Sequence, residues 1–106
     1  MPSLDFAVNQ TAPIAGNAAS KQLVAASAGN AIFAAQLVIA GTANDSTIIL
    51  QDASGGTTLL GPLSILANTT LVLPCNGAWW ARTTIRNGLF FTAAATTTVT
   101  AYYLVR

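Results

Sequence analysis

Short runs rich in threonine, valine, isoleucine, leucine and aromatic residues fill this sequence, and glycine, asparagine, aspartate or proline interrupts them at short intervals. Such runs have the composition of β-strands. Strands that follow one another this closely, with turn residues between them, are typical of a sandwich or a barrel. The pattern therefore predicts an all-β domain, and we expect no helix.

The runs predict about eight or nine strands, one of them interrupted at Gly61-Pro62. The expected ranges are 4–8, 21–26, 32–40, 47–51, 57–60 with 63–66, 69–73, 79–84, 89–92 and 97–105. Segments 52–56 and 86–88 are typical of hairpin turns, because glycine adopts the positive φ that such loops need. We expect one antiparallel β-sandwich over residues 1–106, of jelly-roll or related Greek-key type. An immunoglobulin-like sandwich is the alternative, although its Cys…Trp…Cys pattern is absent.

The longest apolar run, residues 32–40, has two possible structures. Its alanines favour a helix, whereas its β-branched residues and the closing Gly41 favour a strand, which we expect. Alternate residues of a strand share a face. One expected face holds Phe33, Ala35, Leu37 and Ile39, and the other holds Ile32, Ala34, Gln36 and Val38.

Residues 1–20 are expected to form an N-terminal strand and then a small, polar stretch from Asn9 to Ser20. That stretch is either a flexible arm that becomes ordered on a neighbour or an ordinary surface loop. The first residues lack the basic and apolar regions of a signal peptide. The uncharged segment 22–44 is long enough to cross a bilayer, but polar residues divide it and no Lys/Arg cluster flanks it. We therefore expect no membrane partner.

Charged residues are scarce: four basic and three acidic side chains occur among 106 residues, without histidine or glutamate, while 53% of the residues are hydrophobic. A soluble domain of this length carries roughly 26 charged residues. A monomer of this size exposes about 5,500 Å², so each charge serves roughly 800 Å² of surface. A surface this poor in charge suits a protein whose faces are covered by neighbours, and we expect a subunit of an assembly.

The residue types that catalysis requires are nearly absent. The acids are Asp5, Asp45 and Asp52, and there is no histidine to act as a base for a serine or for Cys75, which we expect to be a packed or loop thiol. Asp45 and Asp52 lie in or beside expected turns, where such residues hydrogen-bond their own backbone; a shared calcium site is the alternative. We expect no enzyme, no catalytic residue, no metal, no cofactor and no small-molecule substrate. The net charge of +1 gives no electrostatic basis for binding nucleic acid.

The most distinctive local feature is the aromatic and basic stretch from Trp79 to Arg86. Strand alternation would turn Trp79, Ala81, Thr83 and Ile85 toward the core, and Trp80, Arg82, Thr84 and Arg86 outward. An outward tryptophan beside arginine permits cation–π stacking and has the composition of a binding hot spot. A protein contact, burial of both indoles and a platform for a sugar ring are the three interpretations. The candidate partner-binding residues are Trp80, Arg82, Arg86 and Tyr102.

The stretch from about Ile32 to Val105 resembles a group of small structural proteins of tailed bacteriophage virions. The resemblance rests on a strand, a glycine-rich hairpin, a Gly-Pro before a strand, a strand ending in proline, an aromatic strand and an Asn-Gly-Leu turn. These correspond to residues 47–51, 52–56, 61–62, 68–74, 79–80 and 87–89. It implies a β-sandwich subunit of the particle, such as a capsid decoration or cement protein or a head or tail accessory protein, and it brings no catalytic residues.

Together these features lead us to expect a non-enzymatic capsid decoration or cement protein on the outer surface of the virion head, made in the host cytoplasm. Its expected partners are the major capsid protein and copies of itself, as a homotrimer or homodimer. Attachment by buried apolar area should be weakened little by salt. The alternatives are a tail, neck or fibre component and a receptor- or glycan-binding module.

Overall fold

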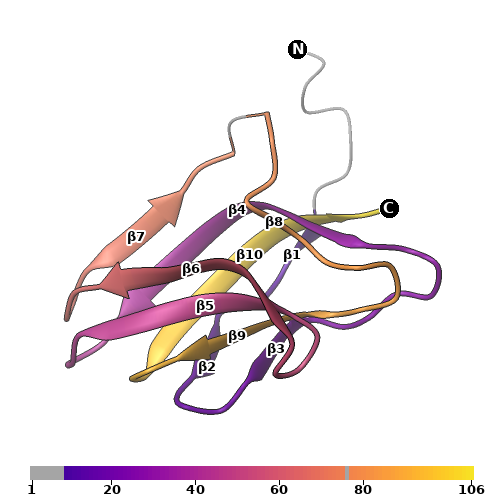
Figure 1. Cartoon of the computed structure of the whole chain (residues 1–106). Coiled ribbons are helices and arrows are strands. Elements are labelled where there is room, and N and C mark those ends of the chain that lie inside the picture. Colours follow the sequence, from indigo (N-terminus) through magenta and orange to yellow (C-terminus); the bar gives the residue numbers. More distant parts are fainter. Residues whose placement is uncertain (1–8, 76) are drawn as a thin grey trace.

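The computed structural model describes residues 9–75 and 77–106, and every regular element in these ranges is a β-strand (Figure 1). The strands are β1 (Asn9–Gln10), β2 (Ile14–Gly16), β3 (Lys21–Val24), β4 (Ile32–Gly41), β5 (Ser46–Asp52), β6 (Thr57–Ile65), β7 (Thr70–Leu73), β8 (Ala81–Arg82), β9 (Leu89–Ala93) and β10 (Thr97–Val105). They form two antiparallel sheets, which confirms the expected all-β fold. The strand expected at residues 4–8 lies outside the described residues.

The strand order is that of a two-sheet sandwich with long-range pairing. In the larger sheet, β1 and β2 both pair with β10, β10 pairs with β4, and β4 pairs with β7 and β8. The smaller sheet has the order β3-β9-β5-β6. When β1 and β2 are taken as one interrupted strand, these two orders form the eight-stranded jelly roll, with β8 as a short addition.

The hydrophobic core lies between the two sheets, because each long strand turns alternate side chains inward. The largest fully buried side chains are Phe91, Ile32, Leu37, Ile39, Ile48, Leu50, Ile65, Leu89, Val99, Thr83 and Thr97. Phe91 on β9 reaches across to β2, where a Cβ on Gly16 would lie 2.7 Å from its ring. Glycine at that position therefore lets β2 pack directly over the ring.

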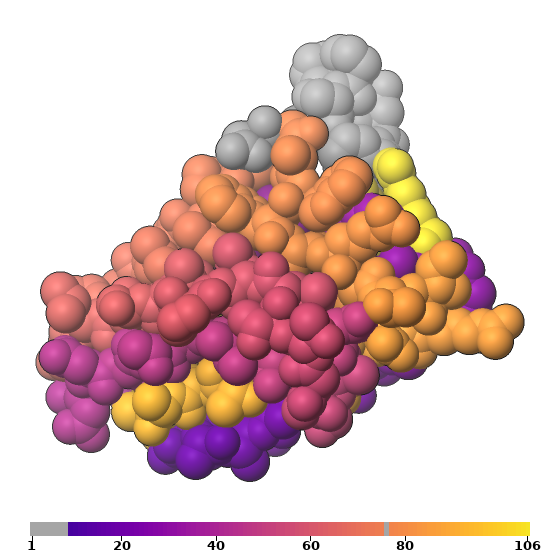
Figure 2. All heavy atoms as spheres, in the orientation of Figure 1, coloured from indigo at the N-terminus to yellow at the C-terminus, as the bar shows by residue number. Residues whose placement is uncertain are grey.

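The loops divide between two ends of the sandwich. The links 42–45 and 66–69 lie at one end, and the links 25–31 and 83–88 lie at the other (Figure 1). In the space-filling view, residues 42–46 are purple at one side and the orange segment near residue 85 projects at the opposite side (Figure 2). Asp45 lies at the first of these ends, and Arg86 and Arg106 lie at the second.

A β-bulge in β4 interrupts its pairing with β10. Gln36 pairs with Tyr102 and Ala34 pairs with Tyr103, so Ala35 is an extra residue without a partner of its own on β10. An extra residue shifts the inward and outward alternation of a strand by one position. The two halves of β4 therefore bury residues of opposite parity.

This shift corrects the expected faces of residues 32–40. Ile32 and Ala34 are buried before the bulge, and Leu37 and Ile39 are buried after it. Phe33 is half-buried on the outer face, between β8 and β10. The prediction that Phe33 shares a face with Leu37 and Ile39 is wrong, because simple alternation does not allow for the bulge.

Two further stretches differ from expectation. Of residues 79–84, only Ala81–Arg82 is a strand, and β8 pairs with β4 in one sheet while β9 lies in the other. Residues 86–88 therefore connect the two sheets and do not form a hairpin turn. Residues 57–65 form one continuous strand through a cis Gly61-Pro62 peptide. By contrast, the hairpin at residues 52–56 is confirmed, since β5 pairs with β6.

The N-terminal half also contains more strand than expected. Strands β1 and β2 fall in the stretch for which we expected an arm or a surface loop. Residues 22–44 form most of β3 and all of β4, so the membrane-helix alternative for this segment is wrong. Within the described residues no helix is long and apolar enough to cross a membrane.

We predict that Phe91→Ala lowers the free energy of unfolding by about 3 to 5 kcal/mol, because it leaves a cavity between the sheets. The matched control is Phe90→Ala, since Phe90 is half-buried on the outer face of the same strand. Urea unfolding followed by circular dichroism measures both values. Equal losses from the two variants would contradict the assignment of the core.

Candidate functional site

The segment that follows β7 is held against the start of β4 by backbone hydrogen bonds. The amides of Trp80, Thr83 and Arg86 donate to the carbonyls of Ala34, Ile32 and Asn30, at 2.8, 2.9 and 2.9 Å. The Ile32 amide donates in return to the Thr83 hydroxyl, at 2.9 Å. Residues 80–86 therefore run along residues 30–34 although only two of them form a strand.

The two tryptophans have the reverse of their expected orientations. Trp80 packs against the core and its Nε1 donates to the Pro74 carbonyl at 3.0 Å. Trp79 is 54% exposed. The expected alternation is right for Ala81 to Thr84, where the first and third residues are buried. The expected alternation is wrong for Trp79 and Trp80, because they precede the strand. It is also wrong for Ile85, which is exposed in the loop after the strand.

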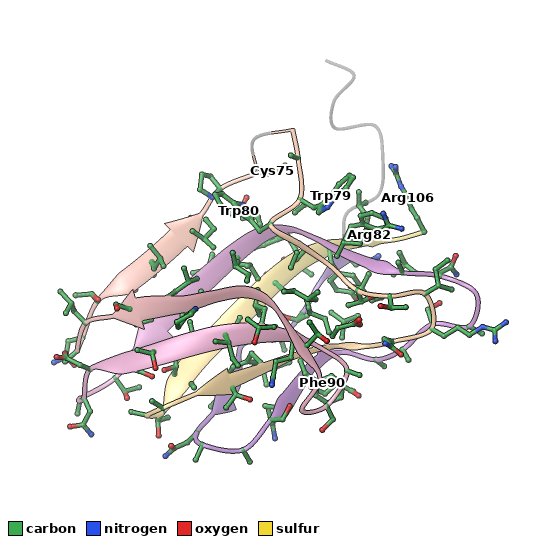
Figure 3. The ribbon with its side chains drawn as sticks, viewed as in Figure 1. Cys75, Trp79, Trp80, Arg82, Phe90 and Arg106 are labelled. Atoms are coloured by element: carbon green, nitrogen blue, oxygen red, sulfur yellow. The ribbon has the colours of Figure 1, made fainter. Side chains whose placement is uncertain are left out.

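Trp79 belongs to an exposed aromatic and basic cluster (Figure 3). Its ring meets Phe33 edge-on, with centroids 4.9 Å apart and planes at 75°. The Arg82 guanidinium carbon lies 5.4 Å from the centroid of the same Phe33 ring. The expected stacking of an arginine on an aromatic ring thus exists, but the ring is Phe33, which the bulge in β4 turns outward.

The other arginines lie along the same segment. Arg86 is bonded through its amide to Asn30, and Arg106 exchanges two backbone hydrogen bonds with Ala31, at 2.7 and 3.0 Å. Figure 3 shows Trp79, Arg82 and Arg106 projecting from the same end of the sandwich. Of the four candidate partner-binding residues, Arg82 and Arg86 therefore lie at this end, whereas Trp80 faces inward.

Tyr102, the fourth candidate, lies on the broad outer face of the larger sheet. Its cross-strand partners are Gln36 and Gln10, which are uncharged. Cross-strand pairing places outward residues of β1, β2, β4 and β7 on the same face as Tyr102.

We call these outward residues the broad face: Gln10, Ala15, Gln36, Val38, Ala40, Thr70, Val72, Thr98, Thr100, Tyr102 and Leu104. Every member is partly or fully exposed and none is charged. The sequence named Tyr102 as a candidate contact residue, but the contents of this face depend on pairing between strands that the sequence does not state.

The described aspartates fasten loops. Asp52, at the end of β5, accepts hydrogen bonds from the Thr84 amide at 3.0 Å, from the Thr84 hydroxyl and from the Asn87 amide group at 3.1 Å. Asp45 accepts from the Ala67 amide at 2.8 Å. The expectation that they bind their own backbone is wrong, because each bonds a different loop. They lie at opposite ends of β5, which excludes a calcium site shared by the two.

The hydrogen bonds control the ionisation of Asp52. Partial burial alone would raise its pKa, but the bonds from the Thr84 side chain, the Thr84 backbone and Asn87 together outweigh this and lower the pKa below its ordinary value of 3.8. Asp52 is therefore charged at neutral pH and fastens the loop 84–87 most strongly in that state.

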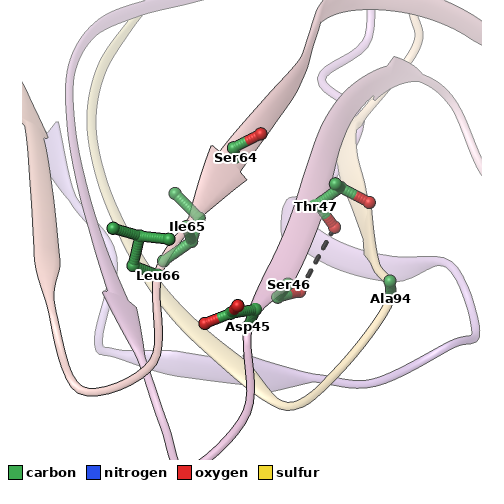
Figure 4. A pocket seen from close by; sticks show the side chains of 7 residues that line it. All are labelled: Asp45, Ser46, Thr47, Ser64, Ile65, Leu66 and Ala94. Atoms are coloured by element: carbon green, nitrogen blue, oxygen red, sulfur yellow. Dashed lines mark hydrogen bonds between the residues drawn. The ribbon is translucent and has the colours of Figure 1, made fainter.

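A hollow of about 270 Å³ lies at the opposite end, where β5 and β6 meet (Figure 4). Asp45, Ser46, Thr47, Ser64, Ile65, Leu66 and Ala94 line it. Asp45 is its single ionisable side chain, and Ser46 donates to the carbonyl of Thr47. The Asp45 carboxylate accepts from the Ala67 amide and the Ser46 hydroxyl donates to backbone carbonyls, so the two groups are not arranged as a base and a nucleophile.

Within residues 9–75 and 77–106, no group of three or more acidic or cysteine side chains could hold a metal ion. Cys75 is exposed in the loop after β7. Comparison with protein-family models, with curated proteins and with solved structures finds no match for this chain. The functional assignment therefore depends on the surface itself.

We predict that Asp52→Ala lowers the free energy of unfolding by about 1 to 2 kcal/mol at neutral pH, because three donors lose a charged acceptor. Since the pKa of Asp52 is lowered by folding, its contribution is present above the unfolded value and is lost as pH falls through the folded value. The difference between the wild type and the variant should therefore shrink in acid. Urea titrations at several pH values measure it; a pH-independent difference would contradict this role.

Proposed function

We propose that this chain is a non-enzymatic structural subunit of a virion, and specifically a capsid decoration or cement protein on the outer surface of the head. The observation that carries the proposal is the broad face, which extends over five strands without a charged side chain. Of the described charged side chains, Arg82 on β8 borders this face beside Phe33 and Leu104, Lys21 lies on the edge strand β3, and the others lie at the ends. The scarcity of charge thus coincides with the surface most suited to flat contact.

The size of this face suits a stable interface. The molecule measures 38 × 31 × 20 Å, so one broad face covers on the order of 1,000 Å², above the about 800 Å² that each partner contributes to a standard interface. Val72 is 49% exposed and lies beside Val38. Threonine and alanine fill much of the remainder, so a partner that covers this face desolvates no charged side chain. The proposed partners are the major capsid subunits and further copies of this chain.

The jelly roll is compatible with this role without proving it. Capsid and lectin domains both use the fold, and a fold alone does not determine a function. The resemblance of residues 32–105 to small structural proteins of tailed phages favours the virion. A location in the tail, neck or fibre is the alternative within the same class.

One observation favours a second candidate, a glycan-binding module. Trp79 is exposed beside Phe33, and an exposed indole face stacks on sugar rings. Titration of the protein with an array of polysaccharides, followed by tryptophan fluorescence, distinguishes the candidates. Saturable quenching that disappears in Trp79→Ala would support this module and count against a purely structural role.

We predict that Val72→Asp and Thr100→Asp each shift the purified protein from an oligomer toward a monomer, because each buries a carboxylate in an uncharged contact. The control is Leu66→Asp, which places the same charge on a 63% exposed residue outside the broad face. Light scattering measures the mass, and circular dichroism verifies that each variant is folded. A wild-type monomer at all concentrations would overturn the proposal.

We also predict that association through the broad face persists from low to high salt, since it contains no ion pair to screen. The mass of the oligomer is measured over a salt series. Dissociation by moderate salt would show that the contact is electrostatic and that the proposed mechanism is wrong.

A further inference from the structure

Charge and exposed apolar surface are concentrated at the end of the sandwich around residues 30–33. Three of the four basic side chains lie there, attached to this segment by strand pairing or backbone bonds. Three of the five exposed large hydrophobic side chains lie there too. We call this surface the arginine–tryptophan end: Trp79, Arg82, Ile85, Arg86, Val105 and Arg106.

The described carboxylates are already occupied. Asp52, which lies nearby, directs its two oxygens at Thr84 and Asn87. Asp45 is at the opposite end of β5 and bonds Ala67. The hydrogen bonds of both described aspartates come from donors other than the exposed arginines, so an aspartate or glutamate that pairs with these arginines comes from outside the described residues.

Contacts between the side chains of this end favour recognition. Arg82 lies over the Phe33 ring, and Trp79 meets the same Phe33 ring in a T-shaped contact. Pre-positioned side chains lose less conformational entropy on binding. Tryptophan and arginine are also the residue types most enriched among those that dominate binding energy.

A second copy is a poor occupant of this surface. In a twofold symmetric contact the same patch meets itself, so arginines would face arginines. The uncharged broad face carries no such penalty. The two surfaces therefore suit different partners.

We propose that the arginine–tryptophan end binds a protein of different sequence, through a surface on which carboxylates surround an apolar centre. This inference rests on the proposed function, because a virion subunit whose broad face meets capsid subunits and its own copies still has this end free for a further protein of the particle. Trp79, Ile85 and Val105 would cover the apolar centre, and Arg82, Arg86 and Arg106 would pair with the carboxylates. Salt would weaken this contact and leave association through the broad face unchanged.

The test begins with a random peptide library selected against the wild-type protein and counter-selected against an Arg82→Gln, Arg86→Gln double variant. We expect enriched sequences that contain Asp or Glu on both sides of an apolar or aromatic residue. Enrichment of neutral or basic sequences would overturn the proposal.

One enriched peptide, labelled for fluorescence polarisation, is then titrated with single variants. Arg82→Gln and Trp79→Ala should each weaken binding about tenfold or more. The controls are Lys21→Gln, which removes the same charge from β3, and Leu66→Ala, which removes an exposed hydrophobic residue at the other end. If Lys21→Gln weakened peptide binding equally, the loss of affinity would follow from the change in net charge. That result would contradict a binding site at the arginine–tryptophan end.

Two further results separate the possible occupants. Tighter binding of polygalacturonate than of the peptide, with the same dependence on Arg82, would assign the end to an acidic polysaccharide and overturn the protein partner. Loss of self-association in Arg82→Gln would assign the end to a second copy and overturn the partner of different sequence. If no peptide is selected but the protein still associates with itself, this inference alone is refuted. If the protein is a monomer that binds the peptide, the broad-face contact is refuted instead.

Discussion

The pairing of β4 with its neighbours is the constraint on which the rest of the structure depends. This strand joins β10, β7 and β8 in one sheet and supplies buried side chains from both of its halves. The extra residue Ala35 allows both halves to face the core while it turns Phe33 outward. The bulge therefore keeps side chains from both halves of β4 in the core. It also exposes the Phe33 ring, which Arg82 and Trp79 contact. Packing and a candidate binding surface have a common origin in this strand.

The few charged side chains of the described residues occupy particular places in the fold. Both described aspartates hold loops between strands, and three arginines lie at one end. The broad face is left to threonine, alanine, valine, leucine, glutamine and tyrosine, and Phe33 and Arg82 border it at one end of the larger sheet. A free monomer with such a surface tends to associate or precipitate, because flat faces without charge favour association. In an assembly the same surface becomes the contact, and the remaining charges can distinguish one partner from another.

Composition and turn signals predicted the all-β class, an antiparallel sandwich of jelly-roll or related Greek-key type and the hairpin at residues 52–56, because strands and turns follow from local residue preferences; the strand order within the sheets depends on distant pairing. They did not predict the phase shift at Ala35 or the separation of β8 from β9, because both depend on pairing between distant segments. The orientations of Trp79 and Trp80 were inverted for the same reason: alternation holds only where a strand exists. The sequence did place Arg82 and Arg86 on one outward surface, but the tryptophan it put beside them, Trp80, faces inward, and Phe33 was missed because its outward position requires the bulge.

The most direct test of the central claim is hydroxyl-radical footprinting of the wild-type protein over a range of concentrations. Tyr102 lies within the broad face, whereas Leu66 lies outside it. If the uncharged face is covered by protein, oxidation of Tyr102 should fall as concentration rises while oxidation of Leu66 stays constant. Constant oxidation of both residues, in a protein that remains monomeric when concentrated, would contradict the account.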